Sequence, residues 1–98
     1  MGAVITVLEA RVDEDRVGDL VSAYQAGAAT LDPGIIGTDL LRDARQPDQW
    51  RIVTRWQGME TLQAMRARGG TPKGIQFFRA AGAEPQLSIF EVVSSGGV

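Results

Sequence analysis

The sequence contains neither histidine nor cysteine, and lysine occurs only once. Without cysteine there is no disulfide and no thiolate nucleophile, and without histidine the commonest metal ligand and general base is missing. Carboxylates are the remaining candidate ligands for a metal, and none are grouped at ligand spacing. The consecutive acids Asp13, Glu14 and Asp15 are typical of a helix start. We therefore expect no metal and no cofactor bound through these residue types.

Charge and hydropathy exclude two further kinds of partner. Ten basic residues against twelve acidic ones give a net charge of −2, and the basic residues are scattered. Nucleic acid binding requires a concentrated basic face, so we expect no nucleic acid partner. No apolar run approaches the ~18 residues of a membrane span. Residues 1–12 lack the basic start and cleavage site of a signal peptide, so we expect a cytoplasmic protein.

The 98 residues are expected to form one domain, 1–98, because a chain of this length has no room for a second core. Residues 94–98 are expected to be a frayed tail. Alternating and helical patterns predict four strands and three helical segments. The strands are expected at 3–12, 34–43, 49–56 and 86–93, and the helices at 13–31, 59–68 and 72–81. Thr71 is expected to cap the last helix, with Pro72 at its first helical position.

The turn Gln46-Pro47-Asp48 predicts an antiparallel hairpin between the second and third strands, with Leu40 opposite Ile52. Alternation then divides the hairpin into two faces. One face carries Ile36, Thr38, Leu40, Trp50, Ile52, Thr54 and Trp56. The other carries Gly37, Asp39, Leu41, Arg51, Val53 and Arg55.

The order β-α-β-β-α-β predicts an α+β, ferredoxin-like split βαβ fold, a four-stranded antiparallel sheet with helices on one face. The opposite face is amphipathic, since it holds Ile5, Val7, Leu41 and Val53 among charged residues. Exposed faces of this kind usually bind a partner. We expect two sheets to meet face to face as a homodimer, which would make a dimeric α/β barrel.

A small-molecule site is predicted between the sheet and the helices. Thr6, Thr38 and Thr54 fall on the helix-facing side, where three hydroxyls are more polarity than a dry core requires. Further site residues are expected from the aromatic and long side chains opposite and from two arginines at the mouth. These are Trp56, Met65, Phe77 and Phe78, with Arg66 and Arg79. The alternative is that the aromatic residues are simply core and the arginines solvated surface.

Three stretches resemble the antibiotic biosynthesis monooxygenase family: VITVLEARV, PGIIGTDLLRD, and VTRW followed by a helix ending in LQAM. The resemblance covers residues 3–93. It implies a cofactor-independent monooxygenase, an oxidoreductase that acts on an aromatic phenol, anthrone or quinol in polyketide or secondary metabolism. Two alternatives stay open. One is a polyketide cyclase or isomerase on the same fold, and the other is a dimer that binds a small ligand without catalysis.

The haem-degrading branch of that family is disfavoured by the same resemblance. Such members use an asparagine, a tryptophan and a histidine, and this chain has Thr6 and Met65 at the first two positions and no histidine near 74–78. A general base is hard to identify. Tyr24 is the only tyrosine, and Glu9, Asp39 and Glu91 are expected on the sheet face away from the helices.

Overall fold

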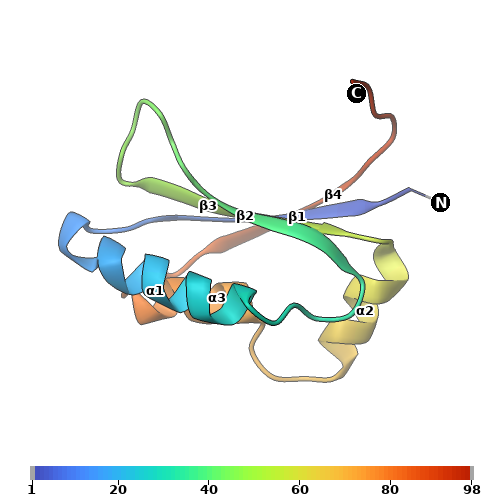
Figure 1. The fold of residues 1–98 in the computed structure, drawn as a ribbon, viewed down its shortest axis with the longest axis horizontal. Helices are drawn as coiled ribbons and strands as arrows, with labels where there is room; N and C mark the ends of the chain where they lie inside the picture. The colour runs from blue at the N-terminus through green and yellow to red at the C-terminus, as the bar shows by residue number, and fades with distance from the viewer. Residues whose placement is uncertain (1, 98) are drawn as a thin grey trace.

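A computed structural model describes residues 2–97 as one sheet with its helices on one side (Figure 1). The elements in chain order are β1 (Val4–Arg11), the 3-10 turn η1 (Glu14–Arg16), α1 (Val17–Ala28), β2 (Ile35–Arg42), β3 (Gln49–Trp56), α2 (Met59–Ala67), α3 (Lys73–Ala80) and β4 (Gln86–Glu91). Residues 94–97 form neither helix nor strand. Val98, the end of the predicted tail, lies outside the described residues.

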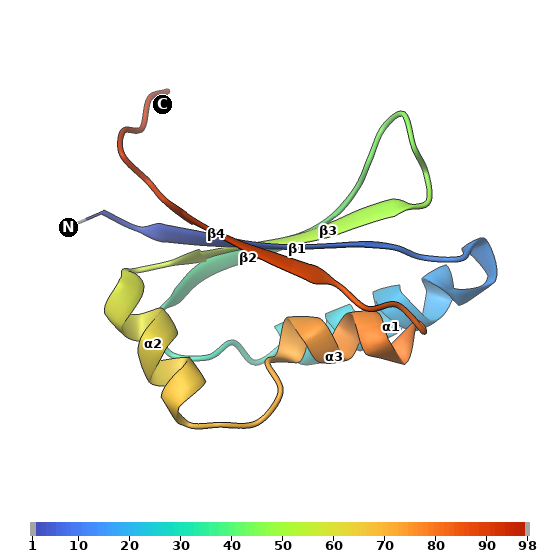
Figure 2. The same ribbon diagram turned by 180° about the vertical axis from the view of Figure 1, so that it is seen from behind.

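The four strands form an antiparallel sheet in the order β2-β3-β1-β4. Both views show α1, α2 and α3 beneath the same face, with α1 and α3 side by side and α2 at the opposite end (Figures 1 and 2). The predicted α+β, ferredoxin-like fold is therefore confirmed. No helix within residues 2–97 is long and apolar enough to span a membrane.

The hairpin register is as predicted, with Leu40 opposite Ile52 and Thr38 opposite Thr54. The prediction fails at the start of β2, where the pairing shifts between Ile35 and Gly37. A bulge adds one unpaired residue and turns the side chains before it to the other face. Ile35 therefore pairs opposite Trp56, whereas Ile36, which was expected on that face, is 56% exposed.

Three predicted ends also differ from the structure. Asp13 makes no side-chain capping hydrogen bond, and the chain passes through η1 before α1 begins at Val17. The N-cap of α3 is Pro72 rather than Thr71. β4 ends at Glu91, two residues before the predicted end, although the Val92 amide still donates to the Ala3 carbonyl at 2.9 Å.

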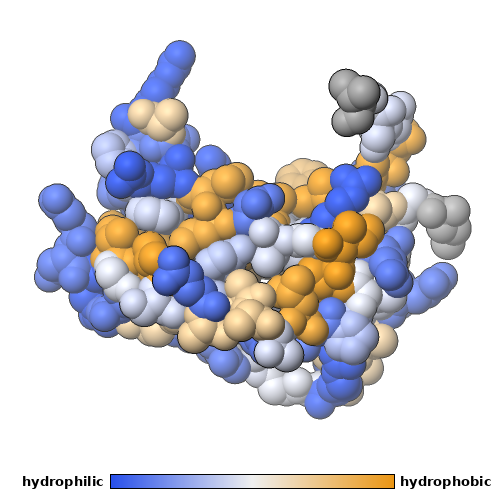
Figure 3. Space-filling view, in the orientation of Figure 1, coloured by the Kyte–Doolittle hydropathy of each residue, from blue (hydrophilic) through white to orange (hydrophobic). Residues whose placement is uncertain are grey.

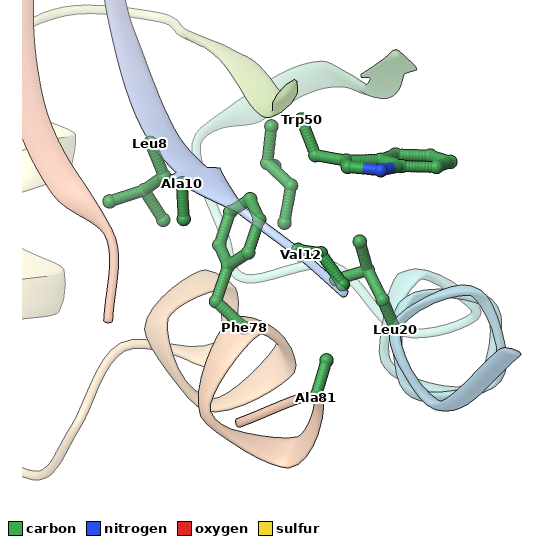
Figure 4. Packing of buried hydrophobic residues seen from close by; sticks show 8 residues of the cluster. Leu8, Ala10, Val12, Leu20, Trp50, Phe78 and Ala81 are labelled. Carbon is green, nitrogen blue, oxygen red and sulfur yellow. The ribbon is translucent and has the colours of Figure 1, made fainter. Parts of the chain in front are cut away.

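The helix-facing side of the sheet carries two separate groups of buried side chains. The larger, which we call the main core, contains Leu8, Ala10, Val12, Leu20, Trp50, Ile52, Phe78 and Ala81. Phe78 points from α3 toward the sheet, and Leu20 closes the core from α1 (Figure 4). The smaller group contains Val4, Trp56 and Leu62, with Ile35, Met59 and Met65 packed against it.

The opposite side of the sheet, the outer face, has no helix over it (Figure 2). It mixes half-buried apolar side chains such as Ile5 and Val53 with charges. The Arg51 Nε lies 2.5 Å from the Glu9 carboxylate, and its Nη1 lies 3.6 Å from Asp43. Exposed apolar side chains also lie on the two edge strands, β2 and β4. In the view with β2 toward the reader, hydrophobic surface gathers in the middle of the molecule (Figure 3). The predicted amphipathic outer face is present.

Candidate functional site

A cavity of about 100 Å³ lies between the two buried groups, with the sheet as its floor and the helices as its walls. Leu8 and Ile52 belong both to its lining and to the main core, and Trp56 and Leu62 belong both to its lining and to the smaller group. The lining is mainly apolar. Such a cavity suits the body of an aromatic molecule.

The floor of the cavity holds a row of three threonines on adjacent strands. Thr38 on β2 pairs with Thr54 on β3, which pairs in turn with Thr6 on β1. All three line the cavity. They share one side of the sheet because each pair sits directly opposite in its ladder. The period-two prediction that placed these threonines together is correct.

Hydrogen bonds fix the row while leaving hydroxyl protons available. The Trp56 Nε1–H donates to the Thr6 Oγ1 at 3.1 Å, and the Thr38 and Thr54 hydroxyls lie 3.2 Å apart. Among the described residues, no acceptor takes the Thr6 proton or the proton of whichever threonine accepts in the Thr38–Thr54 pair. The floor therefore offers donors to an oxygen atom of a bound molecule.

The walls of the cavity are built from α1, α2 and α3. Tyr24 and Phe77 meet edge to face, with ring centroids 5.9 Å apart and an interplanar angle of 76°. Gly27 lets the Phe77 ring lie against α1, because a Cβ at this position would be 2.1 Å from the Phe77 Cζ. On the other side Trp56 and Met65 complete the lining. Two helices therefore present flat apolar surface toward the threonine row.

Three charged side chains line the cavity, Asp32, Arg66 and Lys73, and we call them the rim because Arg66 is exposed and the other two are half-exposed. The Asp32 Oδ1 lies 3.8 Å from the Arg68 Nη2. The Lys73 Nζ donates to the Thr30 carbonyl oxygen at 2.6 Å. Together these contacts connect the α1–β2 loop to the segment between α2 and α3.

Two of the predicted site residues lie elsewhere. Phe78 has no exposed surface and belongs to the main core with Leu20, whereas its neighbour Phe77 lines the cavity, because consecutive residues of a helix point in different directions. Arg79 makes a bidentate contact with Glu84, whose nearest oxygen is 2.7 Å from Nη2. That contact raises the pKa of Arg79 and lowers the pKa of Glu84. The other seven line the cavity: Thr6, Thr38, Thr54, Trp56, Met65, Arg66 and Phe77.

The acids considered as general bases do not reach the cavity. Glu9 binds Arg51, and Asp39 pairs in register with Val53, so both lie on the outer face as expected. Glu91 was expected there too, but it lies opposite Val4 and so shares the helix-facing side, outside this cavity. Tyr24 does line the cavity.

Asp32 and Lys73 are cavity residues that the sequence pattern did not indicate. Each sits beside a proline at a loop end, where neither helical nor strand periodicity applies. The Asp-Pro and Pro-Lys pairs were the available signal, because a charged residue at the junction of a loop and an element is often functional. Within residues 2–97, no three Asp or Glu side chains gather in a way that would hold a metal ion.

A second hollow of about 340 Å³ lies at the N-terminal end of α2. Its lining includes the backbone-rich segment Gln57–Met59 and two acids, Glu60 and Glu91, but no aromatic ring among the described residues. Ligand sites for small molecules are usually lined by apolar and aromatic side chains with a few placed polar groups, and this hollow offers no aromatic surface. The cavity above the threonine row is the better candidate.

Comparison with known proteins adds a family and a set of similar folds. The family model described as "Antibiotic biosynthesis monooxygenase" matches residues 3–72. No curated protein matches. A structure of a variant of SnoaB, a cofactor-independent oxygenase from Streptomyces nogalater, is 16% identical over 97% of both chains, with a TM-score of 0.73.

Two further structures have the same architecture. A conserved protein of unknown function from Bacteroides thetaiotaomicron, described as a possible oxidoreductase, is 23% identical over 93% of this chain and 98% of that one, with a TM-score of 0.72. A conserved protein from Methanosarcina mazei is 14% identical over 92% of each chain, with a TM-score of 0.71. At these identities the likeness shows a shared fold.

Proposed function

Because the chain belongs to the antibiotic biosynthesis monooxygenase family, we propose that it is a cofactor-independent monooxygenase acting on an aromatic molecule of the phenol, anthrone or quinol type. The observation that carries the proposal is the apolar cavity with the threonine row as its floor. The similar fold of SnoaB, described as a cofactor-independent oxygenase, supports the same reaction class.

The reaction requires little covalent chemistry from the protein. With an anthrone, dioxygen oxidises the ring methylene to a carbonyl, so that one oxygen atom enters the product and the other leaves as water with the two methylene hydrogens. The anion of the substrate is the electron donor, and its charge develops on the ring oxygen. Hydroxyl donors held in a cavity with little water stabilise such an oxyanion more than bulk water does. Thr6 and the Thr38–Thr54 pair are placed to supply those donors.

The orientation of the ring follows from the walls. The Tyr24–Phe77 pair provides one apolar wall, and Trp56 with Met65 provides another. The threonine hydroxyls lie on the floor of the cavity. An aromatic substrate would bind with its oxygen toward the floor and its ring along the walls. Holding the reactive carbon in one position beside dioxygen is the positioning part of catalysis.

The first prediction is that the wild-type protein consumes dioxygen with 1,8-dihydroxyanthrone and that Thr38→Trp abolishes this turnover. The indole would fill the space above the floor, where Thr38 lines the cavity. Oxygen uptake and product mass measure the effect. Gln63→Trp, which adds the same ring to an exposed position of α2, is the matched control and should keep the activity.

The outcomes separate the open alternatives. Full turnover by Thr38→Trp would remove the cavity from the reaction. If Thr38→Trp instead lowers the stability by about 1–3 kcal/mol, the site is tightly packed core rather than a pocket. If anthrones and quinols bind without oxygen uptake, the dimer that binds a ligand without catalysis is favoured. If a polyketide analogue undergoes ring closure or isomerisation, the cyclase or isomerase is favoured.

The second prediction concerns assembly through the outer face. Half-buried Ile5, Val7 and Val53 form an apolar area that no helix covers, and exposed Leu41 and Phe90 extend it. We expect a homodimer with these faces in contact, and Val53→Glu should shift it toward monomer because a carboxylate would replace an apolar contact and lose its hydration. Sedimentation at micromolar concentration measures the change. A wild-type protein that sediments as a stable monomer contradicts it.

A further inference from the structure

We propose that the molecule bound in this cavity is an aromatic acid whose carboxylate is held at the rim by Arg66 and Lys73. The inference rests on the proposed site, and it adds a charge requirement that the oxygenation itself does not need. It is carried by three observations: the balance of charge at the rim, the unused donors of the two cations, and the absence of charge further inside.

The rim is positive although the chain as a whole is negative. The chain has a formal charge of −2, whereas the charged side chains lining the cavity are Arg66, Lys73 and one carboxylate, Asp32. Asp32 is itself 3.8 Å from Arg68, which lies outside the lining. A cleft with an excess of one charge concentrates ligands of the opposite charge. The rim therefore selects an anion.

Both cations have donors left for a ligand. Within residues 2–97, no carboxylate lies within 4.0 Å of the Arg66 guanidinium, in contrast to Arg79 with its partner Glu84. The Lys73 ammonium has three donors, and within residues 2–97 its one hydrogen bond goes to the neutral Thr30 carbonyl, which fixes its position without neutralising it. Arg66 is in the last turn of α2 and Lys73 begins α3, so the anion site bridges two helices.

The first turn of α3 adds a second source of positive potential. Lys73, Gly74 and Ile75 all line the cavity, so the N-terminal end of this helix is part of the rim. The N-terminal end of a helix carries a partial positive charge that favours a nearby anion. This dipole acts in the same direction as the two side chains.

Apart from the three rim residues, the described lining contains no ionised side chain. Its polar groups are the threonine hydroxyls and Tyr24, and the rest is apolar. An ionised group deep in the cavity would be desolvated without a partner, which is costly. The ligand is therefore expected to be neutral and aromatic where it meets the threonine row and anionic where it meets Arg66 and Lys73.

The test compares a matched pair of probes, anthraquinone-2-carboxylate and anthraquinone-2-carboxamide, which differ mainly in charge. Binding is followed by quenching of the tryptophan fluorescence, since Trp56 lines the cavity. We expect the carboxylate to bind about tenfold tighter at low salt, as for one charge-assisted contact near the surface. Raising the salt from about 0.02 M to about 0.5 M should remove most of this preference.

Variants locate the preference. Arg66→Gln and Lys73→Gln should each reduce it, and the double variant should bind the two probes equally. Arg79→Gln is the matched control, because it removes an arginine that lies outside the cavity, and it should leave the preference unchanged. A thermal melt of each variant checks folding, and the salt dependence of the wild-type protein tests the inference without any substitution.

The negative outcomes are distinguishable. Equal binding of the two probes by the wild-type protein, or a preference that survives in the double variant, overturns the aromatic-acid inference and leaves the proposed function standing. If neither probe binds, the cavity is not a site for aromatic molecules of this size, and the proposed function fails together with the inference.

Discussion

The main core and the cavity occupy neighbouring parts of the same sheet face, and they differ in what the helices place over them. Above Trp50 and Ala10, α1 contributes Leu20 and α3 contributes Phe78, both without exposed surface. Where the same two helices line the cavity, they contribute the half-buried rings Tyr24 and Phe77 and the glycines Gly27 and Gly74. The sheet is continuous across both regions, so the difference arises in the helices.

The spacing of these residues explains how one pair of helices makes both regions. Gly27 follows Leu20 by seven positions and Gly74 precedes Phe78 by four, so each glycine shares a helix face with a core residue. A Cβ at Gly74 would lie 2.5 Å from the Leu8 Cδ1. At both positions glycine therefore leaves room for a neighbouring side chain, the Phe77 ring at Gly27 and Leu8 at Gly74, where a Cβ would collide.

The largest effect that would test this comparison is expected from Phe78→Ala. Truncating a fully buried phenylalanine should lower the free energy of unfolding by about 3–5 kcal/mol, because it removes apolar contacts and leaves a void. Urea denaturation measures it. Phe77→Ala truncates the adjacent ring, which is only half-buried, and should cost much less. Equal losses would show that the cavity wall is packed as tightly as the main core.

A smaller effect is expected from Thr6→Val, which tests the polar floor. The valine would leave the buried Trp56 Nε1–H without its acceptor, at a cost of about 1–3 kcal/mol in the free energy of unfolding. Thr54→Val is the matched control, because it breaks only the bond between two part-buried hydroxyls. The interpretation fails if Thr54→Val destabilises as much as Thr6→Val in the same urea experiment.

The smallest change in stability is expected from Asp43, which lies in the β2–β3 hairpin beside the main core. Next to it, the Arg42 guanidinium carbon lies 5.7 Å from the centre of the Trp50 ring. The pKa of Asp43 is lowered, first by the Arg45 and Gln46 amides that donate to its carboxylate and then by Arg51. A carboxyl whose folded pKa is depressed stabilises the fold above its usual pKa of 3.8 and loses this contribution as the pH falls.

Asp43→Asn should therefore lower the melting temperature slightly at neutral pH. The difference from wild type should shrink as the pH falls past the usual pKa of 3.8 and vanish only below the lowered pKa of the folded carboxyl. Melting curves from pH 7 to pH 3 measure it. The cavity offers no such dependence through its threonines, which do not titrate in this range. A difference of the same size at every pH would mean that the charge of Asp43 is unimportant.

Local pattern was sufficient to predict the fold and much of the cavity floor. Alternation and the Gln46–Asp48 turn fixed the hairpin register, and period two placed Thr6, Thr38 and Thr54 on one side. It was harder to predict which of Phe77 and Phe78 would be buried in the main core. The answer depends on where α3 starts and on the close packing of the Phe77 ring against Gly27.

The remaining errors have the same origin in contacts between distant or irregular segments. A bulge at the start of β2 exchanged the expected places of Ile35 and Ile36, and no residue in the strand itself marks the extra position. Arg79 was expected at the cavity but binds Glu84, which lies five positions later and past the end of α3, where helical spacing makes no prediction. Lys73 is held at the rim by its hydrogen bond to the Thr30 carbonyl in the α1–β2 loop, a contact between segments that are distant in the sequence.

The threonine row also determines how a ligand would report its own presence. Thr38 and Thr54 come from one hairpin, but Thr6 comes from the first strand, so the three hydroxyls are adjacent only when β1 has paired with that hairpin. A molecule held across them binds the native state alone, and thermodynamic linkage then adds its binding energy to the global stability, about 2.7 kcal/mol at a hundredfold excess over Kd. Compound libraries can therefore be screened for the natural ligand by the rise in melting temperature, before any reaction is known.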